Sequence, residues 1–270
     1  MKIIDAHIHF CQDPHFDQIA ELAGHENSSE HLKNQYDLHN IEHGVVMSNR
    51  SLQLSGHHYP DYLSYCIGLD TTCFEKQEMV QQAQLVEKHL QRENCVGIKL
   101  YPGYHHFYVN DPVFDPYYQL AIQYKKPVAI HTGLTATSAA LLKYSHPMTI
   151  DEVAVRYPEI QFVMCHLGNP WIVDATAVLM KNKNVAADLS GLLEGRIASM
   201  ADFFAEKHGY IDVLKVWLEY LGDYDRLLYG TDWPLANLSN YIEFIAHLIP
   251  EKHHDKVFFD NANRVYNLGL

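Results

Sequence analysis

Two histidines stand two residues apart near the start of the chain, as His7 and His9. Successive side chains of an extended strand alternate between its two faces, so both imidazoles project to the same side. Imidazole is a common ligand of zinc and similar transition metals, and two of them on one strand form half of a metal site. Because the chain has 19 histidines in 270 residues, two of them could also stand two residues apart by chance. The other ligands must therefore come from later strands.

The elements that would position such ligands are short apolar runs, which alternate with longer amphipathic stretches. This alternation is typical of βα units and a parallel sheet. The predicted strands cover residues 3–10, 44–47, 63–69, 96–101, 128–131, 162–166, 185–189 and 227–231. The predicted helices cover 27–43, 79–90, 111–124, 148–157, 171–182, 198–220, 240–248 and 261–268, and the first begins with a capping box of Asn27 and Glu30. No helix is expected at 51–60.

Eight such strands, with no linker or break in composition, predict an α/β fold: a single (β/α)8 TIM barrel with residues 1–270 as one domain. A doubly wound open sheet is the competing architecture, but the glycine-rich phosphate turn that a dinucleotide-binding sheet would need after its first strand is absent. In a barrel, the carboxyl ends of all strands meet at one mouth, where functional sites lie.

Polar residues gather at these predicted strand ends. A single histidine there would more often have a structural role, whereas a set of polar groups on five strands that converge on one mouth predicts a metal site. The set consists of His7, His9, Lys99, His131, His166 and Asp232.

Composition limits the class of partner and the compartment. A formal net charge of -13 and the absence of a basic stripe argue against nucleic acid as partner. No secretory segment or membrane-length apolar run is present, so we expect a cytoplasmic protein without a membrane partner. The five cysteines are scattered and read as reduced thiols. Cys165 precedes His166 on a strand, where the two side chains point to opposite faces, so core packing is preferred for this thiol.

The chain resembles the metal-dependent amidohydrolase superfamily, specifically its amidohydrolase 2 branch of decarboxylases and hydrolases. The resemblance covers essentially the whole chain, and the order of its motifs makes it specific. The motifs are DAHIH at 5–9, GIKLYP at 97–102, PVAIHTG at 127–133, CHLG at 165–168, YGTDWP at 229–234 and NANR at 261–264.

The resemblance implies that His7, His9, His131 and Asp232 bind one divalent metal ion and that His166 stands over the water or substrate. The ion is most often Zn²⁺, and Mn²⁺, Fe²⁺ and Ni²⁺ are compatible with three imidazoles and a carboxylate. Asp232 could then take a proton from the water and pass it to a leaving group. His166 could hydrogen-bond the water or stabilise developing charge.

Lys99 allows two interpretations. In the two-metal branch of the superfamily, a lysine in this place is carboxylated and bridges two ions, and His166 then becomes a ligand of the second. A cationic Lys99 that holds a substrate carboxylate also fits. We prefer one metal ion.

Aromatic and cationic residues around the predicted mouth suggest a pocket for a small cyclic or unsaturated carboxylic acid. For Arg196, a solvated surface charge is the equal alternative, and the aromatic rings could instead cover the barrel. The remaining histidines, including His57 and His89, are expected at the surface. The predicted substrate-binding residues are Lys99, Tyr101, Tyr104, Trp171, Arg196 and Trp233.

These features predict a metal-dependent hydrolase of a small molecule with an amide, ester or lactone bond. A lyase, either a decarboxylase or a hydratase acting on an unsaturated or aromatic acid, would use the same metal ligands, so the sequence does not separate the two. A binding protein with a structural metal is the third hypothesis. The resemblance is also compatible with a homodimer.

Overall fold

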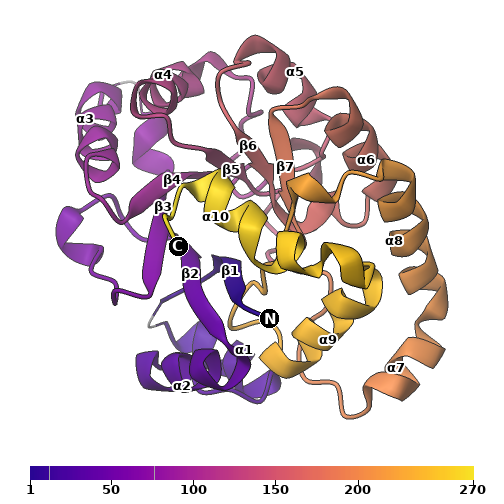
Figure 1. The fold of residues 1–270 in the computed structure, drawn as a ribbon. Helices are drawn as coiled ribbons and strands as arrows, with labels where there is room; N and C mark the ends of the chain where they lie inside the picture. Colours follow the sequence, from indigo (N-terminus) through magenta and orange to yellow (C-terminus); the bar gives the residue numbers. More distant parts are fainter. Residues whose placement is uncertain (12, 76) are drawn as a thin grey trace.

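A ring of eight parallel strands surrounded by helices forms the centre of the computed structural model, which describes residues 1–11, 13–75 and 77–270 (Figure 1). The strands pair in sequence order from β1 to β8, and backbone hydrogen bonds from Asp232 N to His7 O (2.8 Å) and from His9 N to Trp233 O (2.7 Å) join the last strand to the first. The predicted α/β class and (β/α)8 barrel are confirmed. The strands are β1 Ile3–Ile8, β2 Ile41–Met47, β3 Leu63–Gly68, β4 Cys95–Leu100, β5 Val128–Ile130, β6 Phe162–Met164, β7 Val185–Asp188 and β8 Leu227–Leu228.

The helices differ from the predicted ranges most clearly at three places, and α2 also ends at His39, so that residues 41–43 of the predicted helix belong to β2. Helix α1 was not predicted; it begins after Asp13, whose side chain accepts a hydrogen bond from His15 N. Helix α2 is capped by Ser28 rather than Asn27, because the Ser28 hydroxyl accepts the free N–H of the first turn. The stretch predicted as one helix over 198–220 is broken at Lys207. The helices are α1 Pro14–Leu22, α2 Ser29–His39, α3 Met79–Leu90, α4 Asp115–Tyr124, α5 Thr149–Arg156, α6 Ile172–Lys181, α7 Met200–Glu206, α8 His208–Leu221, α9 Leu238–Leu248 and α10 Asn261–Tyr266.

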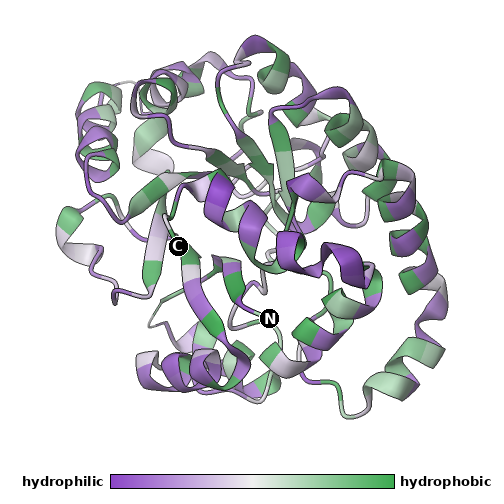
Figure 2. Cartoon of the chain, viewed as in Figure 1, coloured by the Kyte–Doolittle hydropathy of each residue, from purple (hydrophilic) through white to green (hydrophobic). Residues whose placement is uncertain are grey.

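Two apolar layers hold the strands in place. One lies between the barrel and the surrounding helices, and the other fills the barrel interior with residues such as Ile4, Val45 and Val163. Figure 2 shows the hydrophobic strands at the centre and the hydrophilic faces of the helices outside. Helix α10 packs on the interior layer through Val265 and Tyr266 and crosses that end of the barrel (Figure 1). No described helix has the length and hydropathy needed to cross a membrane.

Candidate metal centre

The ends of β1 and β8 bring three potential metal ligands together. His7 lies in β1, His9 directly follows it, and Asp232 follows β8 in the left-handed backbone region (φ 58°). Asp232 Oδ1 lies 3.4 Å from His7 Nε2 and 3.2 Å from His9 Nε2. One ligand atom from each of the three residues lies within 4.8 Å of the other two. The sequence-predicted histidine pair and carboxylate therefore form one cluster.

The hydrogen bonds of the two imidazoles decide which ring nitrogens carry protons. His7 Nδ1 lies 2.8 Å from a carboxylate oxygen of Asp188, and His9 Nδ1 lies 3.0 Å from the backbone carbonyl oxygen of Met47. An ionised carboxylate and a carbonyl only accept hydrogen bonds, so each Nδ1 donates and each Nε2 presents a lone pair. Two lone pairs and the Asp232 carboxylate thus face one another.

This arrangement fits a divalent cation. His7 Nε2 and Asp232 Oδ1 are buried and have no hydrogen-bond partner among residues 1–11, 13–75 and 77–270. Buried acceptors that face one another are costly unless something positive lies between them. Neutral imidazoles and a carboxylate are the donor set of zinc and neighbouring divalent metals. The residues present therefore fit a divalent metal ion.

Asp188, at the end of β7, orients the centre although the sequence analysis missed it. Its Oδ2 accepts the His7 Nδ1 proton, and its Oδ1 accepts hydrogen bonds from the backbone N–H of His166 (2.9 Å) and from the hydroxyl of Ser190. Burial raises the pKa of Asp188, but His7 and its other partners outweigh burial and lower it. A carboxylate at a strand end, preceded by an apolar run, is a signal that could have identified it. Cys165 also has its ligand atom within 4.8 Å of those of His7 and Asp188. His7 and Asp188 are already hydrogen-bonded to each other at that point, so these three residues do not form a second set of free ligands.

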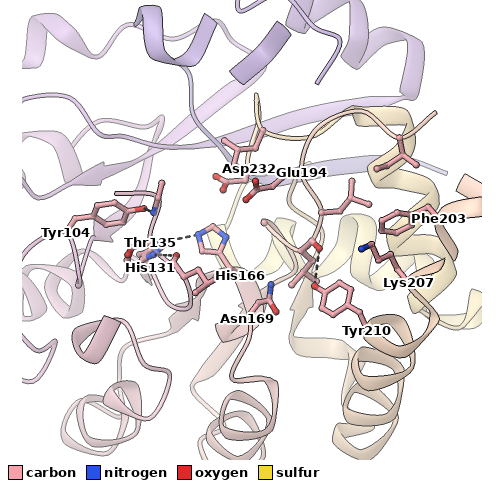
Figure 3. A pocket seen from close by; sticks show the side chains of 17 residues that line it. Tyr104, His131, Thr135, His166, Asn169, Glu194, Phe203, Lys207, Tyr210 and Asp232 are labelled. Carbon is pink, nitrogen blue, oxygen red and sulfur yellow. Dashed lines mark hydrogen bonds between the residues drawn. The ribbon is translucent and has the colours of Figure 1, made fainter. Parts of the chain in front are cut away.

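His166 and His131 form a second pair of acceptors at the same mouth. His166 Nδ1 lies 2.8 Å from Ser190 Oγ, whose proton goes to Asp188, so His166 donates from Nδ1. His131 Nε2 lies 3.1 Å from the carbonyl oxygen of Leu134 and must donate to it. The two remaining nitrogens, His166 Nε2 and His131 Nδ1, lie 3.1 Å apart with lone pairs facing each other (Figure 3). The structure brings His131 to the mouth beside His166 rather than into the three-residue cluster.

Backbone geometry fixes His166 in place. The residue adopts a positive φ of 62°, which is unusual for a side chain with a Cβ. Its backbone N–H is held by Asp188, and its ring lies against Gly191, where a Cβ would come within 2.8 Å of Nδ1. Only glycine at 191 leaves room for this orientation.

Burial controls the ionisation of the site. It lowers the pKa of His7 to about 4, with Lys99 adding in the same direction. Burial also lowers the pKa of His131 and of His166. Burial raises the pKa of Asp232, but the surrounding histidines outweigh it and hold that pKa well below its usual range. At neutral pH the imidazoles of His7, His131 and His166 are therefore neutral and the Asp232 carboxylate is ionised, which are the forms that bind a metal.

Lys99, Tyr101 and Tyr104 lie at the mouth. Lys99 is fully buried, with Nζ 2.8 Å from Cys165 Sγ and 5.2 Å from the centre of the Tyr101 ring. The Tyr101 hydroxyl donates to the carbonyl groups of Met47 and Ser48, and the Tyr104 ring lies edge-on to His131. These three side chains line the cavity next to the metal centre.

Trp171, Trp233 and Arg196 lie outside the two large cavities of the mouth. The Trp171 ring packs on His146, and the buried Trp233 ring packs on His25 at 4.5 Å. The Arg196 side chain is exposed and lies along Gly24. Their placement gives them no share in the cavity walls.

Two cavities meet at the metal centre. The first, here called the metal cavity, has a volume of about 800 Å³ and is lined by His7, His9, Lys99 and, unpredicted, Arg50. The second, the side cavity, has a volume of about 660 Å³. Both are lined by His131, His166 and Asp232, among others. The sequence analysis also missed the residues that line only the side cavity, which include Asn169, Leu192, Leu193, Ile197, Phe203, Lys207 and Tyr210.

Comparison with known proteins points in the same direction. A family model described as "Amidohydrolase" matches residues 70–268. Among curated proteins, protein fluG of Emericella nidulans is 32% identical over 167 residues, which cover 54% of this chain and 18% of that protein. The chain therefore corresponds to less than a fifth of the length of this relative.

Solved structures share the fold at low identity. An uncharacterised TIM-barrel protein from Bordetella bronchiseptica has a TM-score of 0.70 at 22% identity, over 99% of both chains. A 5-carboxyvanillate decarboxylase from Novosphingobium aromaticivorans, complexed with manganese, has a TM-score of 0.65 at 13% identity, over 99% of this chain and 96% of that one. A probable 2-pyrone-4,6-dicarboxylic acid hydrolase from Acinetobacter baumannii has a TM-score of 0.62 at 15% identity, over 99% of this chain and 100% of that one. At these identities the likeness shows the barrel fold alone.

Proposed function

The chain belongs to the amidohydrolase family, and from this premise we propose that it is a metal-dependent hydrolase of a small organic molecule with an amide, ester or lactone bond. The proposal rests on one observation: the ring nitrogens that face the mouth from His7, His9, His131 and His166 are all acceptors, as is Asp232. A centre made of acceptors suits a reaction that begins by removing a proton from water.

We assign the residues to roles by their position. His7, His9 and Asp232 would hold one divalent cation, for which we favour Zn²⁺. His131 lies outside their cluster but faces the same mouth with an accepting Nδ1, and it would complete the ligand set as the fourth ligand. Such a cation, when bound, acts as a Lewis acid and acidifies water. Asp232 takes the water's proton and delivers it to the leaving group. His166 accepts a hydrogen bond from the attacking water at Nε2 and so orients it.

The substitution Asp232→Asn tests this assignment. It keeps the shape of the side chain and removes the proton acceptor, so turnover should fall about a thousandfold. The assay is hydrolysis of a panel of amides, esters and lactones by protein of measured metal content. Asp212→Asn, on the exposed side of α8, is the matched control and should keep full activity. Full activity of Asp232→Asn would exclude its proton role.

The product distinguishes hydrolysis from lyase chemistry, which the same ligands could support. Hydrolysis in ¹⁸O-labelled water should place one label in the acid product. Release of CO₂ without incorporation of label would replace the hydrolase by a decarboxylase. Removal of metal by a chelator should abolish either activity, and loss of thermal stability without any activity to lose would favour a structural metal.

A further inference from the structure

The side cavity extends from the metal centre between the loop after β7 and the start of α8. In Figure 3, Tyr104 and His131 lie on one side of this cavity, Phe203, Lys207 and Tyr210 lie on the other, and His166 lies between them. A group bound in the side cavity would therefore remain connected to a reacting bond over the metal centre. This places the side cavity as a second part of the substrate site.

The wall formed by the loop after β7 is apolar and held in position. Leu192 and Leu193 are each 5% exposed, and Ile197 and Phe203 continue the apolar lining. The Leu192 backbone N–H donates to the Tyr241 hydroxyl (3.1 Å), and its carbonyl accepts from the Tyr210 hydroxyl (3.0 Å). A preformed apolar wall of this kind binds a carbon chain or ring without having to rearrange.

Lys207 supplies the charge at the far end. The break between α7 and α8 falls at this residue, and Figure 3 shows its Nζ directed toward the cavity beside Phe203. In the described part of the chain, no carboxylate lies within ion-pair distance of Lys207. The amide of Asn169 and the Tyr210 hydroxyl are the neutral polar groups nearby. The far end can thus pair with an anion.

The two ends of the side cavity carry opposite charges. Figure 3 shows the carboxylates of Asp232 and Glu194 at the end next to the metal centre, opposite Lys207. An anionic group on a ligand would be repelled by Glu194 and attracted by Lys207. The field therefore favours a ligand whose charged end points away from the reacting bond.

We propose that the side cavity binds the acyl part of the substrate, and that this part is an apolar chain or ring that ends in a carboxylate paired with Lys207. The substrate class is then an amide, ester or lactone of a dicarboxylic acid. This inference rests on the proposed hydrolase function for the bond that is cleaved, but its binding prediction does not require turnover.

The test uses the acids that such a reaction would release. Binding of glutarate, adipate, pimelate and suberate to the metal-loaded protein is measured by calorimetry, alongside the monocarboxylates of equal chain length. The best dicarboxylate should bind about twofold to fivefold more tightly than its matched monocarboxylate, the range expected for one added, partly exposed ion pair. Equal binding of the two series would overturn the proposal.

Variants at position 207 make the test specific. Lys207→Met keeps the length and removes the charge, so it should abolish the preference for dicarboxylates and leave monocarboxylate binding unchanged. Lys207→Glu should reverse the preference, so that 6-aminohexanoate binds more tightly than adipate. Lys183→Met, at an exposed position away from both cavities, is the control and should retain the wild-type preference. A preference retained in Lys207→Met would overturn the role of Lys207.

These binding results separate the two proposals. If Asp232→Asn shows no effect on hydrolysis but the dicarboxylate preference depends on Lys207, the ligand class stands and the reaction must be revised. If hydrolysis requires Asp232 but Lys207→Met changes nothing, the reaction stands and the ligand class fails.

Discussion

Within the described part of the chain, one group of buried histidines lies at the metal centre, and a second group is made of His57, in the loop between β2 and β3, and His89, on α3. In the second group, the rings of His57 and His89 lie 4.6 Å apart, close to the 4.8 Å between His7 and His166. Burial lowers the pKa of His89 to about 4, as it does for His7. By burial, ring distance and pKa, the two groups look alike.

They differ in the partners of their nitrogens. His89 Nε2 donates to the carbonyl of Leu52 (2.9 Å), and its Nδ1 accepts from the Tyr65 hydroxyl (2.8 Å). His57 Nε2 likewise donates to the Ser51 carbonyl (2.9 Å), and its Nδ1 faces the Tyr59 hydroxyl at 3.3 Å. Every ring nitrogen there is satisfied in a neutral imidazole, whereas the metal centre leaves lone pairs facing one another. Lone pairs without a donor therefore separate a ligand from a structural histidine.

Among the changes that test this comparison, the largest effect should come from breaking the orientation of the histidines at the metal centre. Asp188→Asn replaces a pure acceptor by a side chain with one acceptor and one donor, so it cannot hold His7 Nδ1–H, His166 N–H and Ser190 together. Removing such an orienting carboxylate typically costs tenfold to a hundredfold in metal affinity, and we expect a loss of about that size. Competition with a coloured chelator measures the affinity.

Ser190→Ala is the matched variant for that experiment. It leaves the Asp188–His7 contact intact, so metal affinity should change by less than about threefold. It removes the partner of His166 Nδ1, so the ¹⁵N spectrum of the His166 ring should change, while that of the His7 ring should not. Equal losses of affinity in Asp188→Asn and Ser190→Ala would contradict a specific role of Asp188 toward His7.

A smaller effect, on the free energy of unfolding alone, is expected in the second histidine group, His57 and His89. His89→Leu fills similar space but leaves the Tyr65 hydroxyl and the Leu52 carbonyl without their partner, which should lower the free energy of unfolding by about 1–2 kcal/mol. Metal affinity should stay at the wild-type value. Urea unfolding and the same chelator competition measure the two quantities, and a tenfold loss of metal affinity would show that the two histidine groups are not independent.

The comparison also shows what the sequence could predict. The metal-centre residues at the strand ends were identifiable because the apolar runs of β1 and β8 are recognisable in the sequence and a barrel brings the carboxyl ends of its strands to one mouth. His57 and His89 were expected at the surface and are fully buried. His57 lies in a loop without periodicity. The hydrogen-bond partners of its ring lie in the same loop, but the rings of Tyr65 and His89 that pack against it come from β3 and α3, so no local pattern predicts its burial.

Other features of the site depend on local breaks in regular structure. Lys207 faces the side cavity because the helix predicted over 198–220 ends and restarts there. Apolar residues continue on both sides of that point, and the local sign of a break is Gly209, two residues later. Asp188, by contrast, lies one residue before the end of a predicted strand and could have been found by the same reasoning that found Asp232.

The smallest expected effect is a change in the free energy of unfolding at acidic pH. Burial lowers the pKa of His89 from its ordinary value of 6.5 to about 4, and the nearby His57 and Arg92 act in the same direction, while the hydrogen bond to the Leu52 carbonyl opposes them. The unfolded chain therefore takes up this proton near pH 6.5, and the folded chain does so only near pH 4. The contribution of His89 to stability is present above pH 6.5 and is lost as the pH falls toward 4.

The difference in unfolding free energy between wild type and His89→Leu should accordingly narrow, by about 1 kcal/mol, when the pH is lowered from 7 to 5.5. Urea unfolding of both proteins at the two pH values isolates His89 from the other histidines, because all of them are common to the pair. Gln53→Leu, at an exposed position of the same loop whose side chain does not titrate, is the control and should differ from wild type by the same amount at both pH values. A difference for His89→Leu that stays constant or widens in acid would mean that this imidazole is protonated in the fold, and the two histidine groups would then differ in charge as well as in their free lone pairs.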